Sequence, residues 1–158
     1  MPTTLPAPIV NSLAGRDWNR PTARDWAAVL AELPLFARVS KRQLTKIAEL
    51  AHVADYGAGT VVMQEGDPAD SFHLVLSGKA RVVGKPRARI LKTGDYFGEM
   101  ALIDGAPRSA TIASDGELQT MRIPRKPFMR LLEREPSIAV ALLTELAGRV
   151  RRLEKGTD

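Results

Sequence analysis

Cysteine is absent from the 158 residues of this chain. Its absence excludes disulfide bonds, thiolate nucleophiles and cysteine-based metal sites. Aromatic residues make up only 5% of the sequence, and they do not form the base-stacking pattern typical of single-strand nucleic-acid binding. Long apolar runs are missing too, because no stretch approaches the roughly 18–20 residues that cross a bilayer. A membrane-spanning protein is therefore not expected.

Signals for export, metal binding and catalysis are lacking as well. The first ten residues, MPTTLPAPIV, have neither the basic region nor the apolar stretch of a signal peptide, so we expect a cytoplasmic protein. The two histidines, His52 and His73, have no partner at ligand spacing, which predicts no metal site. No nucleophile elbow, Walker loop or nucleophile beside a histidine occurs. The sequence thus predicts a protein that is not an enzyme.

The charge balance is basic but dispersed. The chain has 23 Lys and Arg against 18 Asp and Glu, a net charge of +5. The basic residues lie in separate stretches at 16–24, 85–92 and 149–155, which favours a solvated basic surface over a nucleic-acid interface. A hydrophobic content of 44% is enough to bury a core.

The pattern of prolines and apolar residues divides the chain. Residues 1–22 carry four of the eleven prolines and read as an N-terminal arm or linker, which leaves 23–158 as the domain. Thr22 and Ser40 are expected to cap two short helices, since Gln43 follows Ser40 at the spacing of a capping box. Trp18 and Trp26 are expected to anchor the N-terminal segment by packing.

Short strand-like runs with turn signals between them occupy the middle of the chain. Such spacing argues for an antiparallel barrel or sandwich, with strands expected at 60–63, 72–76, 80–83, 89–91, 110–113 and 118–123. Helical periodicity returns after Pro124, first in a short helix and then in a longer one. The longer helix has an apolar stripe from Ile138 to Leu153 that must pack against the barrel or a second subunit, so a homodimer is possible. The fold class is α+β.

The stretch FGEMALIDGAPRSATI, residues 97–112, places an acid and an arginine in otherwise apolar sequence. Arg108 suits two phosphate oxygens, and Ser109 offers a hydroxyl and an amide. Gly98 allows close approach of a ligand to the main chain, and Glu99 can accept a hydrogen bond from a sugar hydroxyl. Together they indicate a site for a phosphorylated sugar. The alternative is an internal salt bridge between Glu99 and Arg108 without any ligand.

The same stretch resembles the phosphate-binding cassette of cyclic nucleotide-binding domains, the family of the catabolite activator protein and of cAMP-dependent kinase regulatory subunits. The resemblance extends over roughly residues 34–155 and includes the segments at 59–60, 65–69, 74–78 and 94–97. It implies an eight-stranded antiparallel jelly-roll β-barrel flanked by N-terminal helices and two C-terminal helices. The chain ends at Asp158 without an effector domain, from which we expect a stand-alone sensor with an unidentified effector.

The resemblance also implies roles for individual residues. Glu99 would bind the ribose 2′-hydroxyl and Arg108 the cyclic phosphate. The final helix would act as a lid. The other implied ligand-binding residues are the cassette positions Gly98, Met100, Ala101, Ser109 and Ala110, the strand residues Val82 and Leu91, and the lid candidates Arg149, Arg152 and Leu153.

The base preference and two other functions remain open at this point. Ser109 favours cAMP over cGMP, whereas Arg89 would be able to reach a guanine carbonyl. A ligand-free interaction module that acts through a protein or nucleic-acid partner is one alternative. A remnant of a Crp-type transcription regulator that has lost its DNA-reading half is the other.

Overall fold

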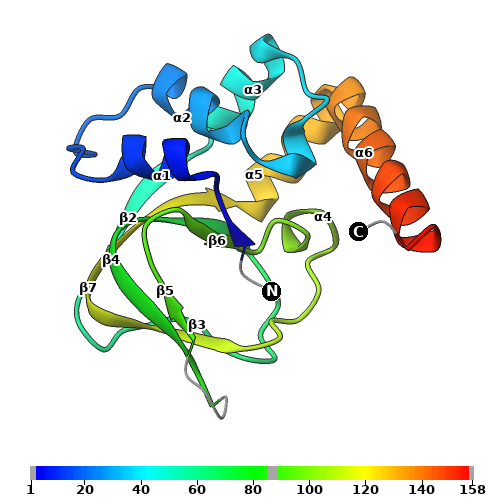
Figure 1. Cartoon of the computed structure of the whole chain (residues 1–158). Coiled ribbons are helices and arrows are strands. Elements are labelled where there is room, and N and C mark those ends of the chain that lie inside the picture. Colours follow the sequence, from blue (N-terminus) through cyan, green and yellow to red (C-terminus); the bar gives the residue numbers. More distant parts are fainter. Residues whose placement is uncertain (1–2, 85–88, 157–158) are drawn as a thin grey trace.

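The structure is a computed structural model that describes residues 3–84 and 89–156. A curved antiparallel sheet forms one part of the molecule, and most of the helices gather over one end of it (Figure 1). The expected α+β class is therefore confirmed. The helices are α1 (Ala7–Leu13), α2 (Ala23–Leu30), the 3-10 turn η1 (Pro34–Phe36), α3 (Lys41–Ala48), α4 (Ala101–Asp104), α5 (Arg125–Arg134) and α6 (Pro136–Glu154).

The described residues form seven strands in one sheet, with the order β1-β6-β4-β7-β2, β3 beside β7 and β5 beside β4. All of the pairs are antiparallel. The eight separate strands implied by the resemblance are not observed in this part of the chain. The strands are β1 (Thr3–Thr4), β2 (His52–Tyr56), β3 (Val61–Met63), β4 (Ser71–Val83), β5 (Ile90–Leu91), β6 (Asp95–Phe97) and β7 (Thr111–Pro124).

Two expected turns are absent, so that four expected strand runs join into two long strands. The runs at 72–76 and 80–83 belong to the single strand β4, and those at 110–113 and 118–123 belong to β7. The register between these strands shifts where Gly78 faces Leu118 and Lys79 faces Asp115. Gly78 and Gly116 both have positive φ there, at 79° and 77°, as bulged strands require. What reads as two turns in the sequence is thus a bulge that bends two long strands together.

Both predicted helix caps are present. The side chain of Thr22 accepts from the amide of Asp25 in a capping box that begins α2. Ser40 and Gln43 form the corresponding box at the start of α3. These caps satisfy amides that have no partner inside the helix, so local sequence determines where both helices begin.

The segment expected to be an arm is packed in the structure. Leu5, Leu13 and Trp18 are buried in the main core. The rings of Trp18 and Trp26 stack at 4.6 Å, which confirms the expected packing role of the tryptophans. Strand β1 pairs with β6, and so the N-terminal segment covers the edge strand that leads into residues 98–110. The domain boundary at residue 22 stays a prediction.

Two hydrophobic clusters divide the interior. The larger cluster joins the helices to one end of the sheet and includes Phe36, Phe72 and Phe128. The smaller cluster lies inside the curved sheet and consists of Val75, Ala80, Val82, Leu91, Phe97, Ile112 and Leu118.

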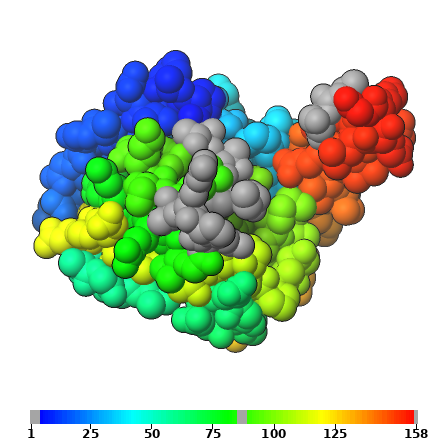
Figure 2. Space-filling model, turned by 60° about the horizontal axis from the view of Figure 1, so that its bottom comes forward, coloured from blue at the N-terminus to red at the C-terminus, as the bar shows by residue number. Residues whose placement is uncertain are grey.

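Helices α5 and α6 follow β7 as the sequence predicts. Ile138 and Leu142 of α6 are buried in the main core. The later part of α6 projects from the body of the molecule (Figure 2). Within the described ranges, no helix combines the length and the apolar character needed to cross a membrane.

Candidate ligand-binding site

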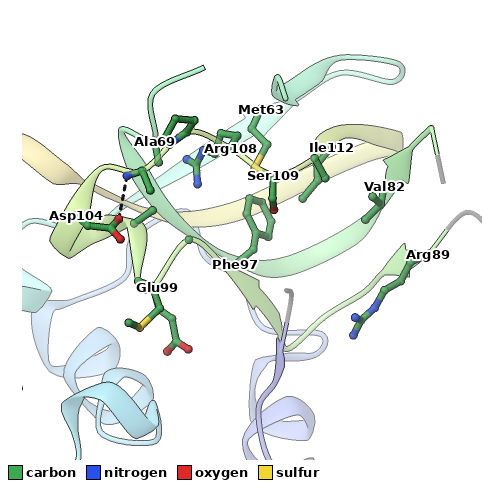
Figure 3. A pocket seen from close by; sticks show the side chains of 16 residues that line it. Met63, Ala69, Val82, Arg89, Phe97, Glu99, Asp104, Arg108, Ser109 and Ile112 are labelled. Carbon is green, nitrogen blue, oxygen red and sulfur yellow. Dashed lines mark hydrogen bonds between the residues drawn. The ribbon is translucent and has the colours of Figure 1, made fainter. Parts of the chain in front are cut away.

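A pocket of about 690 Å³ lies between the inner face of the sheet and the segment 98–110. Figure 3 shows Arg108 and Arg89 toward opposite ends of it, with Ser109, Phe97 and Ile112 between them. The volume suits a small organic ligand. The lining residues are Met63, Ala69, Val82, Arg89, Phe97, Gly98, Glu99, Met100, Ala101, Asp104, Ala106, Pro107, Arg108, Ser109, Ala110 and Ile112.

Gly98 connects β6 to the cassette in a conformation that other residues rarely adopt. Its φ is 86°. A Cβ added to it would lie 2.7 Å from the carbonyl oxygen of Ser71 and 2.8 Å from Nη1 of Arg108. Both distances are shorter than any normal carbon contact, so only glycine fits. The backbone of Gly98 thus lies directly against the guanidinium group.

Arg108 is held at one end of the pocket with only 8% of its surface exposed. Its Nη2 donates a hydrogen bond of 2.7 Å to the carbonyl oxygen of Ser71 and lies 3.7 Å from Oδ1 of Asp70. Burial lowers the pKa of Arg108, and the nearby Asp70 carboxylate opposes this shift. Within residues 3–84 and 89–156, Nε and Nη1 have no hydrogen-bond partner. Planar donors are therefore left over for an anion.

Glu99 also has an unmet bonding requirement. Its Oε1 lies 3.9 Å from Nη1 of Arg149 in α6, while its buried Oε2 accepts no hydrogen bond from any described residue. Burial raises the pKa of Glu99, and Arg149 acts in the opposite direction. A buried acceptor without a donor is unfavourable, so a hydroxyl of a ligand would supply what Oε2 lacks.

Glu99 and Arg108 do not neutralise each other. No ion pair joins them in the described part of the chain: Arg108 pairs with Asp70, and Glu99 pairs with Arg149. In Figure 3 the carboxylate of Glu99 points away from Arg108. The alternative of an internal salt bridge between the two is therefore wrong for this structure.

Most of the residues expected from the sequence meet at this pocket. Four of the expected residues do not line it: Leu91, Arg149, Arg152 and Leu153. Leu91 is fully buried in the smaller hydrophobic cluster. Arg152 pairs with Glu145 on α6, and Leu153 is exposed. The residues that line the pocket as expected are Val82, Arg89, Gly98, Glu99, Met100, Ala101, Arg108, Ser109 and Ala110.

Among the lid candidates, Arg149 contacts the cassette. Its Nη1 lies 3.5 Å from Sδ of Met100 as well as near Glu99. The final helix is thus joined to the site through this side chain in the present structure.

Several lining residues were not anticipated from the sequence. Met63, Ala69 and Ile112 come from segments far apart in the chain, and only the folded sheet brings them together. Phe97 belongs to the cassette stretch and also forms a wall of the pocket. A large apolar residue directly before Gly98 was the available signal in the sequence. The remaining unexpected residues are Asp104, Ala106 and Pro107.

The donor set fits an organic anion rather than a metal. Among the described residues, no group of three or more potential metal-ligating side chains is close enough to hold an ion. Arg108 supplies unpaired cationic donors, Glu99 an unpaired acceptor, and the sheet an apolar wall. The amides of Glu99, Met100 and Ser109 form no backbone hydrogen bond within this part of the structure. The arrangement can bind one ligand that carries an anion, a hydroxyl group and an apolar face.

Comparison with known proteins identifies the class to which this fold and pocket belong. The family described as the cyclic nucleotide-binding domain matches residues 53–135. That match includes the whole cassette and more than half of the chain. The chain belongs to the cyclic nucleotide-binding domain family.

Particular relatives are regulatory proteins. The cAMP-dependent protein kinase regulatory subunit of Emericella nidulans is 37% identical over 113 residues, which is 69% of this chain and 27% of that protein. The corresponding subunit of Schizosaccharomyces pombe is 37% identical over 109 residues, 68% of this chain and 26% of the relative. The chain therefore spans about a quarter of the length of the curated relatives it matches.

Solved structures of regulatory proteins are also similar to this chain. The N-terminal domain of a transcriptional regulator from Streptomyces coelicolor has a TM-score of 0.68 and 27% identity, over 82% of this chain and 95% of that one. The regulatory domain of Toxoplasma gondii PKA, solved with cAMP, has a TM-score of 0.57 and 25% identity, over 80% and 50% of the two chains. The Thermus thermophilus catabolite activator protein has a TM-score of 0.56 and 28% identity, over 78% and 61%.

Proposed function

We propose that this chain is a sensor that binds a cyclic nucleotide, cAMP in preference to cGMP, in the pocket beside residues 98–110. The observation that carries the proposal is a pair of unmet requirements in one pocket. Glu99 Oε2 is buried without a donor, and Arg108 retains unpaired nitrogens. A cyclic nucleotide satisfies both, because its ribose hydroxyl donates and its phosphate accepts.

The proposed orientation follows from where these groups lie. The cyclic phosphate lies against Arg108, Ser109 and the amides of Gly98, Ala101 and Ala110. The ribose 2′-hydroxyl donates to Glu99, and its hydrogen bond stabilises the carboxylate that burial disfavours. The base then extends along the sheet toward Val82 and Arg89, at the other end of the pocket.

The base preference rests on two residues. Ser109 is expected to favour cAMP by its resemblance to the family's cassette, and the Toxoplasma gondii relative was solved with cAMP. Arg89 lines the pocket and would donate to a guanine carbonyl, which favours cGMP. Arg89→Ala should leave cAMP affinity nearly unchanged and weaken cGMP, as a competition titration with both nucleotides would detect. An equal loss for both would remove Arg89 from base discrimination.

Signal output is proposed to proceed through α6. The ribose hydroxyl donates to Oε2 of Glu99 and draws the carboxylate toward the ligand, which weakens the ion pair between Oε1 and Arg149 that now joins α6 to the cassette. The cassette and α6 then rearrange, and α6 closes as a lid. We expect Arg149 to reach the base more readily than Arg152 or Leu153. In this proposal the chain performs no catalysis, needs no metal and acts in the cytoplasm on an effector yet to be identified.

A homodimer through α6 is part of the proposal. Val140, Leu143, Val150 and Leu153 are 53–64% exposed on the projecting helix of Figure 2. Exposed apolar residues three and seven positions apart are typical of helix pairing. Sedimentation analysis should show a dimer for the wild type and a monomer for Leu143→Glu. A monomeric wild type at all concentrations would contradict this.

The eight-stranded jelly roll is also part of the proposal. The bulges in β4 and β7 divide each strand into two arms, and counting the arms separately while leaving out the two-residue β1 gives the eight strands of the jelly roll. We keep that description as a proposal.

A pair of ligands tests the function at the level of single groups. Binding of cAMP and of 2′-deoxy-cAMP should be measured for the wild type and for Glu99→Gln. We expect the wild type to lose about tenfold in affinity without the 2′-hydroxyl, and Glu99→Gln to distinguish the two ligands far less. Equal binding of both ligands by the wild type would contradict the role of Glu99.

The two other functions predict different results. A ligand-free interaction module would show no binding of either nucleotide and would be captured through a partner instead. A remnant of a transcription regulator would retain salt-dependent affinity for DNA.

A further inference from the structure

A chain of buried polar side chains runs beneath the pocket, across the centre of the sheet. Ser71, His73 and Thr120 are each no more than 2% exposed. His73 Nε2 lies 3.1 Å from Ser71 Oγ, and His73 Nδ1 lies 3.1 Å from Thr120 Oγ1. Ser71 Oγ in turn donates to Oδ1 of Asp70 over 2.8 Å. A fully buried histidine with both ring nitrogens bonded is a built feature of this core.

The direction of each hydrogen bond follows from the number of protons. The single hydroxyl proton of Ser71 goes to Asp70, so His73 Nε2 must donate to Ser71. Burial, followed by the charge of Arg108, lowers the pKa of His73 to about 3, so its ring is neutral near pH 7 and carries its one proton on Nε2. The other ring nitrogen, Nδ1, then accepts from the hydroxyl of Thr120.

This series of hydrogen-bonded side chains ends at the guanidinium group of Arg108, which faces the pocket. Arg108 Nη2 donates to the carbonyl oxygen of Ser71 at 2.7 Å and lies 3.4 Å from its Oγ. Ser71 Oγ thus accepts a hydrogen bond from His73, faces Arg108 and donates a hydrogen bond to Asp70. If His73 no longer bonds to it, Ser71 Oγ is held only by Asp70, and Arg108 loses part of its fixed support.

His73 supports the opposite wall as well. Its ring stacks on Phe97, with centroids 5.1 Å apart and an interplanar angle of 18°. Phe97 lines the pocket and directly precedes Gly98. One imidazole therefore contacts both the support of Arg108 and the strand that leads into the cassette.

We propose that His73 is a positioning residue for anion recognition, which holds Arg108 through Ser71 and the start of the cassette through Phe97 before the ligand arrives. This inference rests on the proposed function of the pocket. Preorganised donors bind more tightly because less conformational freedom is lost on binding. What distinguishes His73 from a residue that only fills the core is that its two partners, Ser71 and Phe97, lie next to Arg108 and Gly98.

His73→Phe is the informative variant, since it keeps an aromatic ring of similar size against Phe97 and removes both hydrogen bonds. His73→Gln restores a donor near the position of Nε2. Ser114→Ala is the control, because Ser114 is another buried polar residue of β7, bonded to Gly57 and not in the pocket. We expect His73→Phe to weaken cAMP binding about tenfold, His73→Gln to recover part of the loss, and Ser114→Ala to leave affinity unchanged.

The decisive readout is a double-mutant cycle with Arg108→Lys, measured by calorimetry with cAMP at a temperature where all variants are folded. If His73 acts through Arg108, His73→Phe should change affinity less than twofold in the Arg108→Lys background. Equal losses in both backgrounds, or no loss in the wild-type background, would overturn the positioning role. A wild type that binds neither cAMP nor cGMP would overturn the proposed function, and the role of His73 with it.

Discussion

Gly98 is the position where a single methyl group should affect both folding and binding. Its φ of 86° is strained for alanine, a cost of about 1–2 kcal/mol. The added Cβ would also lie 2.7 Å from the carbonyl oxygen of Ser71 and 2.8 Å from Arg108 Nη1. The Ser71 carbonyl belongs to β4 and cannot move without disturbing the ladder. Overpacking of this kind costs about 1–3 kcal/mol, so Gly98→Ala should lower the free energy of unfolding by about 2–5 kcal/mol.

A matched control separates the cost of the positive φ from the cost of overpacking. Gly59 has a φ of 73°, and a Cβ there would meet nothing within 4 Å, so Gly59→Ala should cost only about 1–2 kcal/mol. Urea denaturation measures both values. Because Arg108 must shift to admit the methyl group, Gly98→Ala should also weaken cAMP binding at least tenfold in calorimetry, while Gly59→Ala should not. Equal stability and equal affinity of the two variants would refute the close approach of Gly98 and Arg108.

Three further predictions concern acid sensitivity, the N-terminal segment and the lid. The unfolded chain protonates His73 near pH 6.5 and the folded chain only near pH 3, so the free energy of unfolding should fall as the pH drops through this range. In His73→Phe the free energy of unfolding from urea denaturation should fall about 2 kcal/mol less between pH 7 and pH 5 than in the wild type, and identical profiles would contradict it. Trp26→Ala removes the buried partner of Trp18 and should reduce the urea-derived free energy of unfolding by about 3–5 kcal/mol, whereas a loss below about 1 kcal/mol would show that the N-terminal segment is not packed. Arg149→Ala should raise the pKa of Glu99, because Arg149 now lowers it; a carboxyl NMR titration without an upward shift would exclude the contact.

The parts of the fold that local chemistry determines were predictable. Thr22 and Ser40 lie at helix starts because a cap depends on residues only three positions apart. The turn signal at Ser77-Gly78 was misleading, since a glycine with positive φ serves a bulge as well as a turn. Only the pairing of β4 with β7 over their whole length distinguishes these two cases, and such pairing is not a local property of the sequence.

The candidate site was likewise predictable only where its residues are close together in the sequence. The cassette residues between Gly98 and Ala110 are contiguous, so their chemistry was visible in the sequence. Asp70 and Ser71, which hold Arg108, lie 37 or more positions away and are brought to it by the sheet. His73 gave no signal in the sequence beyond being a lone histidine on an apolar strand. Its role depends on neighbours that only the fold supplies.

Cyclic nucleotide binding through Arg108 is tested most directly by titration calorimetry with cAMP and cGMP on the wild type, Arg108→Ala and Arg108→Lys. The account predicts micromolar or tighter binding of cAMP by the wild type, weaker binding of cGMP, and a loss of at least tenfold in both variants, since lysine keeps the charge without the planar donors. No heat and no change in melting temperature with either nucleotide, for a folded wild type, would contradict it. So would undiminished binding by Arg108→Ala.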